Sequence, residues 1–391
     1  MTKLKVLVFV GYYLPGYKAG GPLRTIANMV AHLKDDIEFW IVTRDRDLGD
    51  SVAYPGVQVN QWQATQGAHV YYISPEHCTV RQIGVIISET NHDVLYLNSF
   101  YDPVFTVKPL LARRFFSVGT KPCVVAPRGE FSVGAIALKA TRKRVYNALS
   151  GFFGLYKDVV FQASSKHEVQ DIIAVLGVER GCIEVAIDLP EIRLPVCDSS
   201  VLASEVFVSD VLKVIFLSRI SPKKNLDFAI RALSLTSKKI QFDIYGPTED
   251  LIYWGECQSL FAKLPSSVLV NYCGSVMPSE VQKVFSQYDL FFFPTRGENY
   301  GHVIAESLSV GTPVLLSDQT PWRDLEPQGL GWDISLVSPK VFAEKIDQFA
   351  SLEFDVRLLQ RSVVQAQAIK LLQSPENVEE NLNLFRARLQ S

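Results

Sequence analysis

The sequence of 391 residues lacks the cysteine spacing of a metal site or a disulfide framework. Its six cysteines are scattered along the chain, and none of them forms a C-x-x-C pair. That pattern excludes a small cysteine-rich scaffold and indicates a reducing compartment. The sequence therefore predicts a fold that is stabilised by an apolar core.

Long apolar runs and a charge imbalance are also missing. No segment approaches the roughly 18 apolar residues that a membrane-spanning helix needs. The net charge of −2 gives no reason to expect a nucleic-acid partner. No G-x-G-x-x-G follows the first apolar run, because Gly16, Gly20 and Gly21 do not fit that spacing, and a dinucleotide dehydrogenase is disfavoured. We expect a soluble cytoplasmic protein, attached at most to a membrane surface.

The sequence does contain the material for two α/β domains. Its length exceeds one ordinary core, and 48% of the residues are apolar. Short apolar runs alternate with helical patterns, which predicts parallel sheets with helices on both faces. The expected strands are Lys5–Val10, Ile37–Val42, Val94–Leu97, Cys123–Ala126, Val159–Ala163, Leu212–Leu217, Ile240–Tyr245, Val268–Tyr272, Leu290–Phe293 and Pro313–Ser317. The expected helices include Leu23–Leu33, Leu226–Leu235, Ser279–Ser286, Pro339–Phe349 and Val356–Leu372.

The domain boundaries follow from a stretch without clear periodicity, Asp188–Asp210, which we interpret as the linker region. We place the first domain at residues 1–190 and the second at 191–372. A last helix, within 375–391, is expected to return to the first domain. In open α/β sheets ligands bind beyond the carboxyl ends of the strands, so the loops that follow strands are where chemistry is expected.

The most informative of these loops lies near residue 300. The apolar run Phe291–Phe293 predicts a buried strand, Gly297 to Gly301 a tight loop, and His302 onward a helix. Seven residues separate Glu298 from Glu306, so two carboxylates bracket a helix N-terminus, where backbone N–H groups favour a phosphate. Eight helical steps would span about 12 Å. That distance suits a nucleotide-sugar, whose two hydroxyl-bearing ends flank a diphosphate.

Two further loops support an anionic ligand. Arg219 and Lys224 follow the first strand of the second domain, where a cation pair can clamp a diphosphate leaving group. Gly20 and Gly21 follow the first strand of the chain and let backbone approach a ligand closely. A plain flexible connector is the alternative for the glycine loop.

Together these motifs resemble a known family. Ser218-Arg219-Ile220 followed by Lys224, and then Glu298-x7-Glu306 with Tyr300-Gly301 inside, is similar to the retaining "group 1" (GT4-like) glycosyltransferases of GT-B fold. The Gly20-Gly21 loop, the linker and Gly311-Thr312-Pro313-Val314 match the family's layout. The resemblance implies two Rossmann-like parallel-sheet domains facing across a cleft.

The resemblance also implies roles for residues. Arg219, Lys224 and Glu298 would form the catalytic centre, with Arg219 and Lys224 on the diphosphate and Glu298 on the hydroxyls of the donor sugar. Glu306 would bind the ribose hydroxyls. Gly20, Gly21, Asn299, Tyr300 and Gly301 would complete the donor site. The donor would be a UDP- or GDP-sugar, and the acceptor a glycan or a lipid-linked glycan, with no cofactor and no metal.

The acceptor side departs from the family pattern. Family members often carry a histidine where Asn98 follows a middle strand of the first domain. An asparagine donates hydrogen bonds but cannot be a general base, which fits a mechanism in which the leaving phosphate accepts the proton. Arg128 and Glu130 follow another strand and are candidates for acceptor binding, with a structural ion pair as the alternative.

A basic segment suggests a surface for membrane contact. Lys139, Arg142, Lys143 and Arg144 precede Phe152-Phe153, and basic residues beside exposed aromatics suit an anionic membrane, here the inner face of the cytoplasmic membrane. An ordinary solvated helix face is the alternative.

The sequence thus favours a glycosyltransferase, with bacterial surface-polysaccharide assembly as its setting. A nucleotide-sugar epimerase on the same fold would need general bases facing the sugar, and no convincing pair is found. A non-catalytic nucleotide-sugar-binding protein would be expected to lack Arg219, Lys224 or Glu298, and all three are present.

Overall fold

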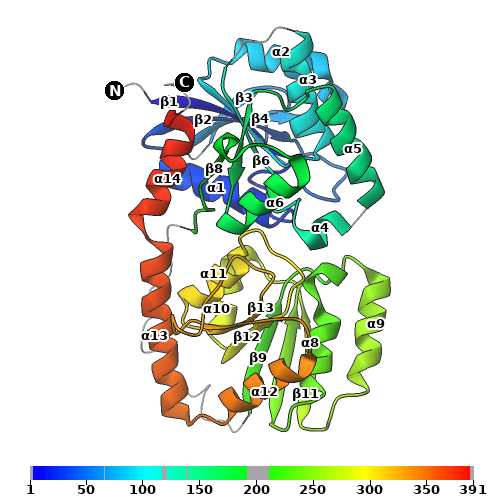
Figure 1. The fold of residues 1–391 in the computed structure, drawn as a ribbon, viewed down its shortest axis with the longest axis vertical. Helices are drawn as coiled ribbons and strands as arrows, with labels where there is room; N and C mark the ends of the chain where they lie inside the picture. The colour runs from blue at the N-terminus through cyan, green and yellow to red at the C-terminus, as the bar shows by residue number, and fades with distance from the viewer. Residues whose placement is uncertain (1–2, 66, 117–120, 138–139, 192–210, 388–391) are drawn as a thin grey trace. The chain divides into compact units, whose positions relative to one another are not determined.

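The computed structural model describes residues 3–65, 67–116, 121–137, 140–191 and 211–387. Its contacts divide the chain into two compact units, Met1–Ile192 with Ser374–Ser391, and Arg193–Gln373. Each unit is built on one sheet, mostly parallel in the first unit and parallel in the second, with helices around it, as the alternating pattern predicts (Figure 1).

The sheet of the first unit has eight strands within the described residues, in the order β3-β4-β2-β1-β5-β6-β7-β8. Only the edge pair β3 and β4 is antiparallel among these neighbours, while the others run parallel. The strands are β1 (Leu4–Phe9), β2 (Ile37–Arg44), β3 (Trp62–Thr65), β4 (Ala68–Ile73), β5 (Val94–Asn98), β6 (Cys123–Ala126), β7 (Val159–Ala163) and β8 (Ile183–Val185).

The central strand β1 shows why this sheet needs helices on both faces. Val6 and Val8 belong to one hydrophobic cluster, whereas Leu7 and Phe9 belong to another. Successive side chains of a strand point to opposite faces, so an uninterrupted apolar run buries both. The helices are α1 (Gly21–Leu33), α2 (Val80–Glu89), α3 (Lys108–Phe115), α4 (Val133–Ala137), α5 (Ala140–Phe152) and α6 (Lys166–Leu176), with short turns η1 (Pro75–His77), η2 (Pro103–Val107) and η3 (Arg180–Cys182).

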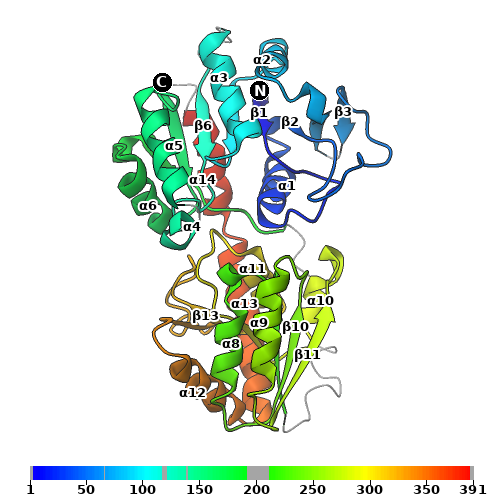
Figure 2. The same cartoon turned by 90° about the vertical axis from the view of Figure 1, so that its right-hand side faces the viewer.

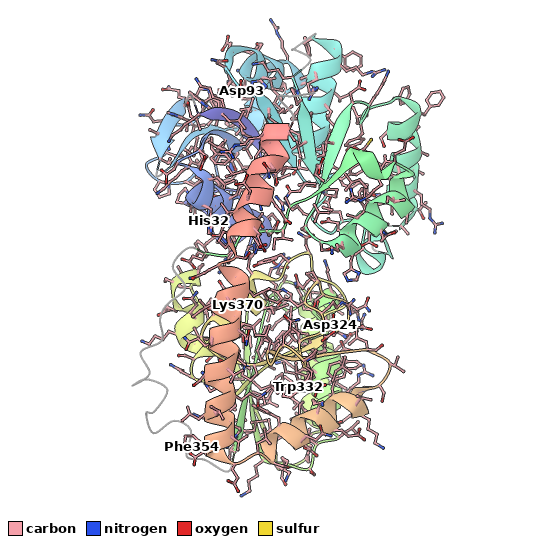
Figure 3. All side chains as sticks on the ribbon, turned by 60° about the vertical axis from the view of Figure 1, so that its left-hand side comes forward. His32, Asp93, Asp324, Trp332, Phe354 and Lys370 are labelled. Carbon is pink, nitrogen blue, oxygen red and sulfur yellow. The ribbon has the colours of Figure 1, made fainter. Side chains whose placement is uncertain are left out.

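The last helix, α14 (Pro375–Arg386), packs on the first unit, which confirms the predicted return of the chain. Phe385 is fully buried, and its ring lies 5.2 Å from the ring of Tyr96. Arg386 Nη2 donates to Asp36 Oδ1 over 2.8 Å. The helix lies beside α1, on which His32 is labelled in Figure 3.

The sheet of the second unit has six strands within the described residues, in the order β11-β10-β9-β12-β13-β14, all parallel. Ile215 of β9 pairs with Phe291 of β12 at the centre. The order reverses between these two strands, and such a switch point is where ligands bind in open α/β sheets. The strands are β9 (Leu212–Leu217), β10 (Ile240–Tyr245), β11 (Val268–Gly274), β12 (Leu290–Phe293), β13 (Val314–Ser317) and β14 (Gly331–Ile334).

The helices of this unit form two groups. In one group α8 contacts both α9 and α12, and in the other α11 contacts both α10 and α13. Figure 2 shows α8 and α9 in front of the sheet and α13 behind it. Their bounds are η5 (Pro222–Lys224), α8 (Leu226–Leu233), α9 (Leu251–Phe261), η6 (Pro278–Glu280), α10 (Val281–Phe285), α11 (His302–Ser309), α12 (Pro339–Ala350) and α13 (Phe354–Leu372).

The described part of the chain contains five cysteines, all of them free thiols, and Cys197 lies outside it. The predicted linker, 188–210, also lies outside the described residues, apart from 188–191. None of the described helices is both long and apolar enough to cross a bilayer.

Candidate functional site

The loops that follow β9 and β12 meet in the second unit, because the two strands are neighbours. Arg296 N donates to Lys223 O over 2.8 Å, and Thr295 Oγ1 donates to the same carbonyl over 3.2 Å. Asn225 is almost fully buried between the loops, and its Nδ2 donates to Pro294 O over 2.9 Å. These bonds fix one loop against the other, so the side chains at their tips have defined positions.

At these tips Lys224 and Glu298 form an ion pair between Nζ and Oε1. Each side chain is 13% exposed, so the pair is shielded from most of the solvent. The Lys224 ammonium also lies 5.3 Å from the centre of the Phe293 ring. The structure therefore brings together two of the three residues predicted as catalytic, from opposite sides of the β9–β12 switch point.

Arg219, the third of them, lies on the same loop but in another contact. Its Nη1 lies 3.3 Å from both carboxylate oxygens of Glu249, and its side chain is 46% exposed. Glu249 follows β10 in sequence, so three strands contribute loops to this edge. An exposed pair of this kind is weak, and the guanidinium can exchange Glu249 for another anion at little cost.

The close approach of the β9 and β10 loops depends on Gly246. Its φ is +136°, and a Cβ built there would lie 1.8 Å from Ser218 O. Ser218 N donates to Tyr245 O over 3.0 Å, and Ile220 N to Pro247 O over 2.9 Å. Only a residue without a side chain fits here, so Gly246 sets the position of the segment that carries Arg219.

Helix α11 begins at His302, immediately after Gly301, whose φ of +81° is left-handed. Tyr300 is buried, and its carbonyl accepts a hydrogen bond from Trp322 Nε1 over 2.5 Å. The amides of a first helical turn point out along the helix axis, toward the strand ends. Only the residues from His302 onward are helical, so the 12 Å spacing of Glu298 and Glu306 that an all-helical segment would give does not apply.

The other predicted donor-site residues of this segment follow Glu298 directly. Asn299, Tyr300 and Gly301 lie in the same loop, and Glu306 lies in the helix that follows it. A Cβ on Gly301 would lie 2.7 Å from Ile304 Cδ1 and 3.7 Å from Glu298 Cγ. The 3.7 Å contact with Glu298 is an ordinary one, whereas the 2.7 Å approach to Ile304 and the left-handed φ explain why a glycine stands before the helix. Glu306 lies in the second turn of α11.

In the first unit, Gly20 and Gly21 stand at the N-terminus of α1. Gly20 has a φ of +69°, and Cβ atoms built on either glycine would meet nothing within 4 Å. Pro22 follows in the first turn of the helix. The backbone here is open to a close approach by a ligand.

Asn98 and Arg128 meet at the carboxyl ends of β5 and β6. Arg128 Nη2 and Nε lie 3.1 and 3.3 Å from Asn98 Oδ1, and Nη1 forms an ion pair with Asp188. The Arg128 side chain is 7% exposed and that of Asp188 2%. Burial alone lowers the pKa of Arg128, but Asp188 and Tyr96 outweigh it, and the net pKa is raised. The guanidinium is therefore charged and enclosed by protein groups.

Within the described part of the chain, the amide nitrogen of Asn98 is unpaired, unlike its oxygen. Nδ2 is buried and has no hydrogen-bond partner among the described residues. Because Oδ1 accepts from Arg128, the guanidinium fixes which way the amide is turned. The donor that remains is directed away from Arg128.

Glu130 is bound by the loop after β5. Its carboxylate accepts hydrogen bonds from Ser99 Oγ at 2.7 Å and from the amides of Phe100 and Tyr101 at 2.6 and 3.2 Å. Burial raises the pKa of this carboxyl, and these hydrogen bonds and Lys143 oppose the rise. Glu130 joins two loops of the first unit in this way.

The described residues contain no group of three or more histidine, cysteine, aspartate or glutamate side chains that could hold a metal ion. The candidate donor side in the second unit is instead built from a paired lysine, an arginine and two glutamates.

Comparison with known proteins identifies the segment that carries these groups. Residues 202–367 match the family model described as "Glycosyl transferases group 1". This segment belongs to the group 1 glycosyl transferases. It contains Arg219, Lys224, Glu298 and Glu306, so the family resemblance that those residues predict is confirmed.

Solved structures give the fold of the whole chain. The Anabaena protein HepE, in complex with UDP and glucose, is 15% identical, with a TM-score of 0.73 over 99% of this chain and 100% of that one. A sucrose-phosphate synthase from Thermosynechococcus elongatus is 13% identical, with a TM-score of 0.73 over 100% of both chains. The glycosyl transferase segment therefore lies in a chain of GT-B fold, as expected.

A curated relative extends the comparison to sequence. An "Uncharacterized 41.2 kDa protein in cps region" from Klebsiella pneumoniae is 22% identical over 246 residues. The match covers 61% of this chain and 63% of the relative, so it spans less than two thirds of that protein's length.

The sequence reasoning missed several residues of the glycosyl transferase segment and of the first unit. Glu249 follows a strand, as Arg219 and Glu298 do, and the same rule could have found it. Trp322 and Asp188 also follow strands, β13 and β8, but nothing local indicates the partner that each contacts from a loop distant in sequence.

Proposed function

We propose that the protein transfers a sugar from a nucleotide-diphospho-sugar to a glycan or lipid-linked acceptor, with retention of anomeric configuration. The observation that carries this proposal is the Lys224–Glu298 pair at the β9–β12 switch point of a group 1 glycosyl transferase segment. A cation and a carboxylate held side by side can address the two halves of such a donor, the diphosphate and the sugar hydroxyls.

In the proposed donor site, the diphosphate binds Lys224 and Arg219, replacing the carboxylates of Glu298 and Glu249. Released from Lys224, Glu298 accepts hydrogen bonds from the sugar hydroxyls, and Glu306 accepts them from the ribose. The backbone of Asn299, Tyr300 and Gly301 meets sugar and phosphate at the start of α11. Gly20 and Gly21 provide the approach from the first unit.

The proposed chemistry needs no metal and no protein base. As the bond from the anomeric carbon to the phosphate breaks, negative charge develops on the phosphate oxygens, and the two cations stabilise it. The leaving phosphate accepts the proton of the attacking acceptor hydroxyl. Asn98 donates through its buried Nδ2 to an acceptor hydroxyl, which agrees with the orphaned donor there. Arg128 holds the amide in that orientation, and Glu130 holds the neighbouring loop.

A UDP-sugar is the donor that we favour over a GDP-sugar, since the Anabaena neighbour is a complex with UDP and glucose. The cps-region relative supports polysaccharide assembly as the setting. We place the protein in the cytoplasm, at the inner face of the membrane where a lipid-linked acceptor would be found.

The test is a thermal-shift panel of UDP, GDP, ADP, CMP and dTDP in the presence of EDTA, on the wild type and on Lys224→Ala. A nucleotide that binds only the native state at 100 times its Kd stabilises it by about 2.7 kcal/mol. We expect UDP to raise the melting temperature of the wild type without metal, and the variant to lose most of the rise. A rise that EDTA abolishes would contradict metal independence, and an equal rise in Lys224→Ala would contradict the site.

A further inference from the structure

Helix α5 of the first unit presents an apolar stripe to solvent. Val145, Leu149 and Phe152 are 54, 52 and 85% exposed. They are spaced by four and three residues, so they lie on one face of the helix. Phe153 follows at 62% exposed, and its ring lies 5.2 Å from that of Phe152. The two rings shield each other only in part, and the stripe ends in a large exposed aromatic pair. Figure 1 shows α5 on the outside of its unit.

The surroundings of this stripe are positively charged. No aspartate or glutamate occurs between Glu130 and Asp158, although the chain as a whole has a net charge of −2. Arg142, Arg144 and Lys157 are exposed. Lys143, which was predicted to belong to this basic patch, is instead turned toward the protein. Its Nζ donates to Glu130 O and Ala135 O over 3.3 and 3.0 Å and lies over the Tyr101 ring. Lys139 lies outside the described residues.

A cavity of about 530 Å³ adjoins the stripe within the same unit. From α5 it is lined by Asn147, Ala148, Ser150 and Gly151, and its floor consists mainly of aromatic and aliphatic side chains. Lys157 is part of its wall, and Arg144 lies one helical turn before Ala148 on the same face of α5. The other lining residues are Phe100, Gly154, Tyr156, Phe161, Val175, Leu176 and Val178.

We propose that α5 docks the protein on an anionic phospholipid bilayer and that the cavity takes a hydrocarbon chain of one of its lipids. The stripe of Val145, Leu149 and Phe152 enters the headgroup region, as the apolar face of an interfacial helix does. Arg142, Arg144 and Lys157 then meet lipid phosphates, and each such cation strengthens binding about fivefold. The positive charge favours an anionic bilayer over an uncharged apolar partner, because only the bilayer would pair with the cations on both sides of the stripe.

This inference deepens the proposed function, on which its purpose rests, because a docked first unit would hold an acceptor that is carried on a lipid. The docking itself needs neither donor nor acceptor. Vesicle binding and nucleotide binding can therefore fail separately, and each failure contradicts a different statement.

The docking half is tested by co-sedimentation of the full chain with vesicles of phosphatidylcholine, with and without 30% phosphatidylglycerol, a composition chosen to be about one third anionic. We expect binding to the anionic vesicles to be at least about 10-fold stronger, and 0.5 M salt to reduce it. F152S/F153S should lose about 10-fold or more, and R142Q/R144Q about 25-fold, at two cations of about fivefold each. The control L251S/I252S, on α9 at 73 and 80% exposed, should bind like the wild type.

Equal binding to both kinds of vesicle, or an equal loss in the α9 control, would overturn the docking surface. All variants change exposed side chains, and circular dichroism with an unchanged UDP-induced thermal shift verifies that each has folded.

The cavity half is tested by filling the cavity from α5. A Cβ on Gly151 would meet nothing within 4 Å, and Gly255 on α9 is equally open, so Gly151→Leu and Gly255→Leu are matched changes in two exposed helix positions. The probe is a fluorescent dansyl fatty acid. We expect Gly151→Leu to weaken its binding at least about fivefold and Gly255→Leu to leave it unchanged. Equal binding in all three proteins, or none to the wild type, would overturn the cavity as a lipid site.

Discussion

Lys224 Nζ and Glu298 Oε1 form an ion pair although their residues are 74 positions apart in the sequence. The pair joins the loop after β9 to the loop after β12, and both side chains are 13% exposed. A largely buried pair is costly to break from one side, because the remaining charge loses its partner. The two residues should therefore behave as a unit in stability as well as in sugar transfer.

The first prediction is a double-mutant cycle on this pair. Lys224→Met and Glu298→Gln should each lower the free energy of unfolding by about 1–3 kcal/mol, whereas the double variant should lose less than the sum. Each single change should reduce the transfer rate about 100- to 1,000-fold, because in the proposed mechanism Lys224 stabilises developing charge and Glu298 holds the sugar. Urea unfolding and a UDP-release assay measure the two effects.

Arg231→Met and Asp227→Asn provide the matched control. That pair also joins a cation to a carboxylate, but its Arg231 side chain is 59% exposed. It should show a coupling below about 0.5 kcal/mol. Additive losses at Lys224 and Glu298, with near-normal transfer in both variants, would refute the assignment of the site.

The central strands of both sheets could be predicted from the sequence because they are buried on both faces. β1, β9 and β12 each contain four consecutive apolar residues, and β10 is apolar apart from Gln241 and Asp243, so the expected strands agree with the observed ones to within a residue. β3 and β14 were not predicted, because edge strands are half exposed and carry little apolar signal. β4 is different, since its run Val70–Ile73 has the composition of a buried strand and could have been found.

The candidate site was predictable in its residue types but not in its pairing. Position after a strand, combined with the Glu298–Glu306 spacing and the family resemblance, selected Arg219, Lys224 and Glu298. Nothing local indicates that Lys224 binds Glu298 while Arg219 binds Glu249, because those contacts depend on which strands are neighbours. The sequence left Arg128 open between an acceptor contact and an ion pair, and the distant Asp188 now occupies one edge of its guanidinium.

A second prediction concerns the glycine that lets two loops approach. Gly246→Ala should lower the free energy of unfolding by about 3 kcal/mol or more, because its Cβ would lie 1.8 Å from Ser218 O. Gly255→Ala, within α9 and with open space around it, should instead raise that free energy by about 0.5–1 kcal/mol. Urea denaturation of both variants measures the contrast, and a neutral Gly246→Ala would show that the backbone there can move aside.

A third prediction separates the structural role of Arg128 from donor binding. Asp188→Asn should lower the free energy of unfolding by about 3–5 kcal/mol, because it leaves the Arg128 guanidinium charged and enclosed. The thermal shift caused by UDP should not change, since the residues proposed to bind the diphosphate and the ribose, Arg219, Lys224 and Glu306, lie in the second unit. Thr25→Val removes the 2.9 Å hydrogen bond to Asp188 Oδ2 but leaves its charge in place, and should cost about 1 kcal/mol. A loss of the UDP shift in Asp188→Asn would tie this network to the donor site.

The last prediction is a pH dependence at Glu130. Burial raises the pKa of its carboxyl above the ordinary 4.5, so between these two values the folded state binds more protons than the unfolded state. The stability contributed by Glu130 is therefore present below pH 4.5 and is lost as the pH rises through the folded pKa. Glu130→Gln cannot titrate. The free energy of unfolding of the wild type minus that of Glu130→Gln should thus decrease as the pH rises above 4.5, and then level off.

Urea titrations at half-unit steps from pH 4.5 to 7.5 measure this difference. Other buried acids with raised pKa values, Glu168 and Asp289, titrate in both proteins and cancel. A difference that increases with pH would mean that the hydrogen bonds from Ser99, Phe100 and Tyr101 stabilise the carboxylate more than burial penalises it. Glu130 would then be a charged anchor of the β5 loop, and its negative charge would lie beside any acceptor bound at Asn98.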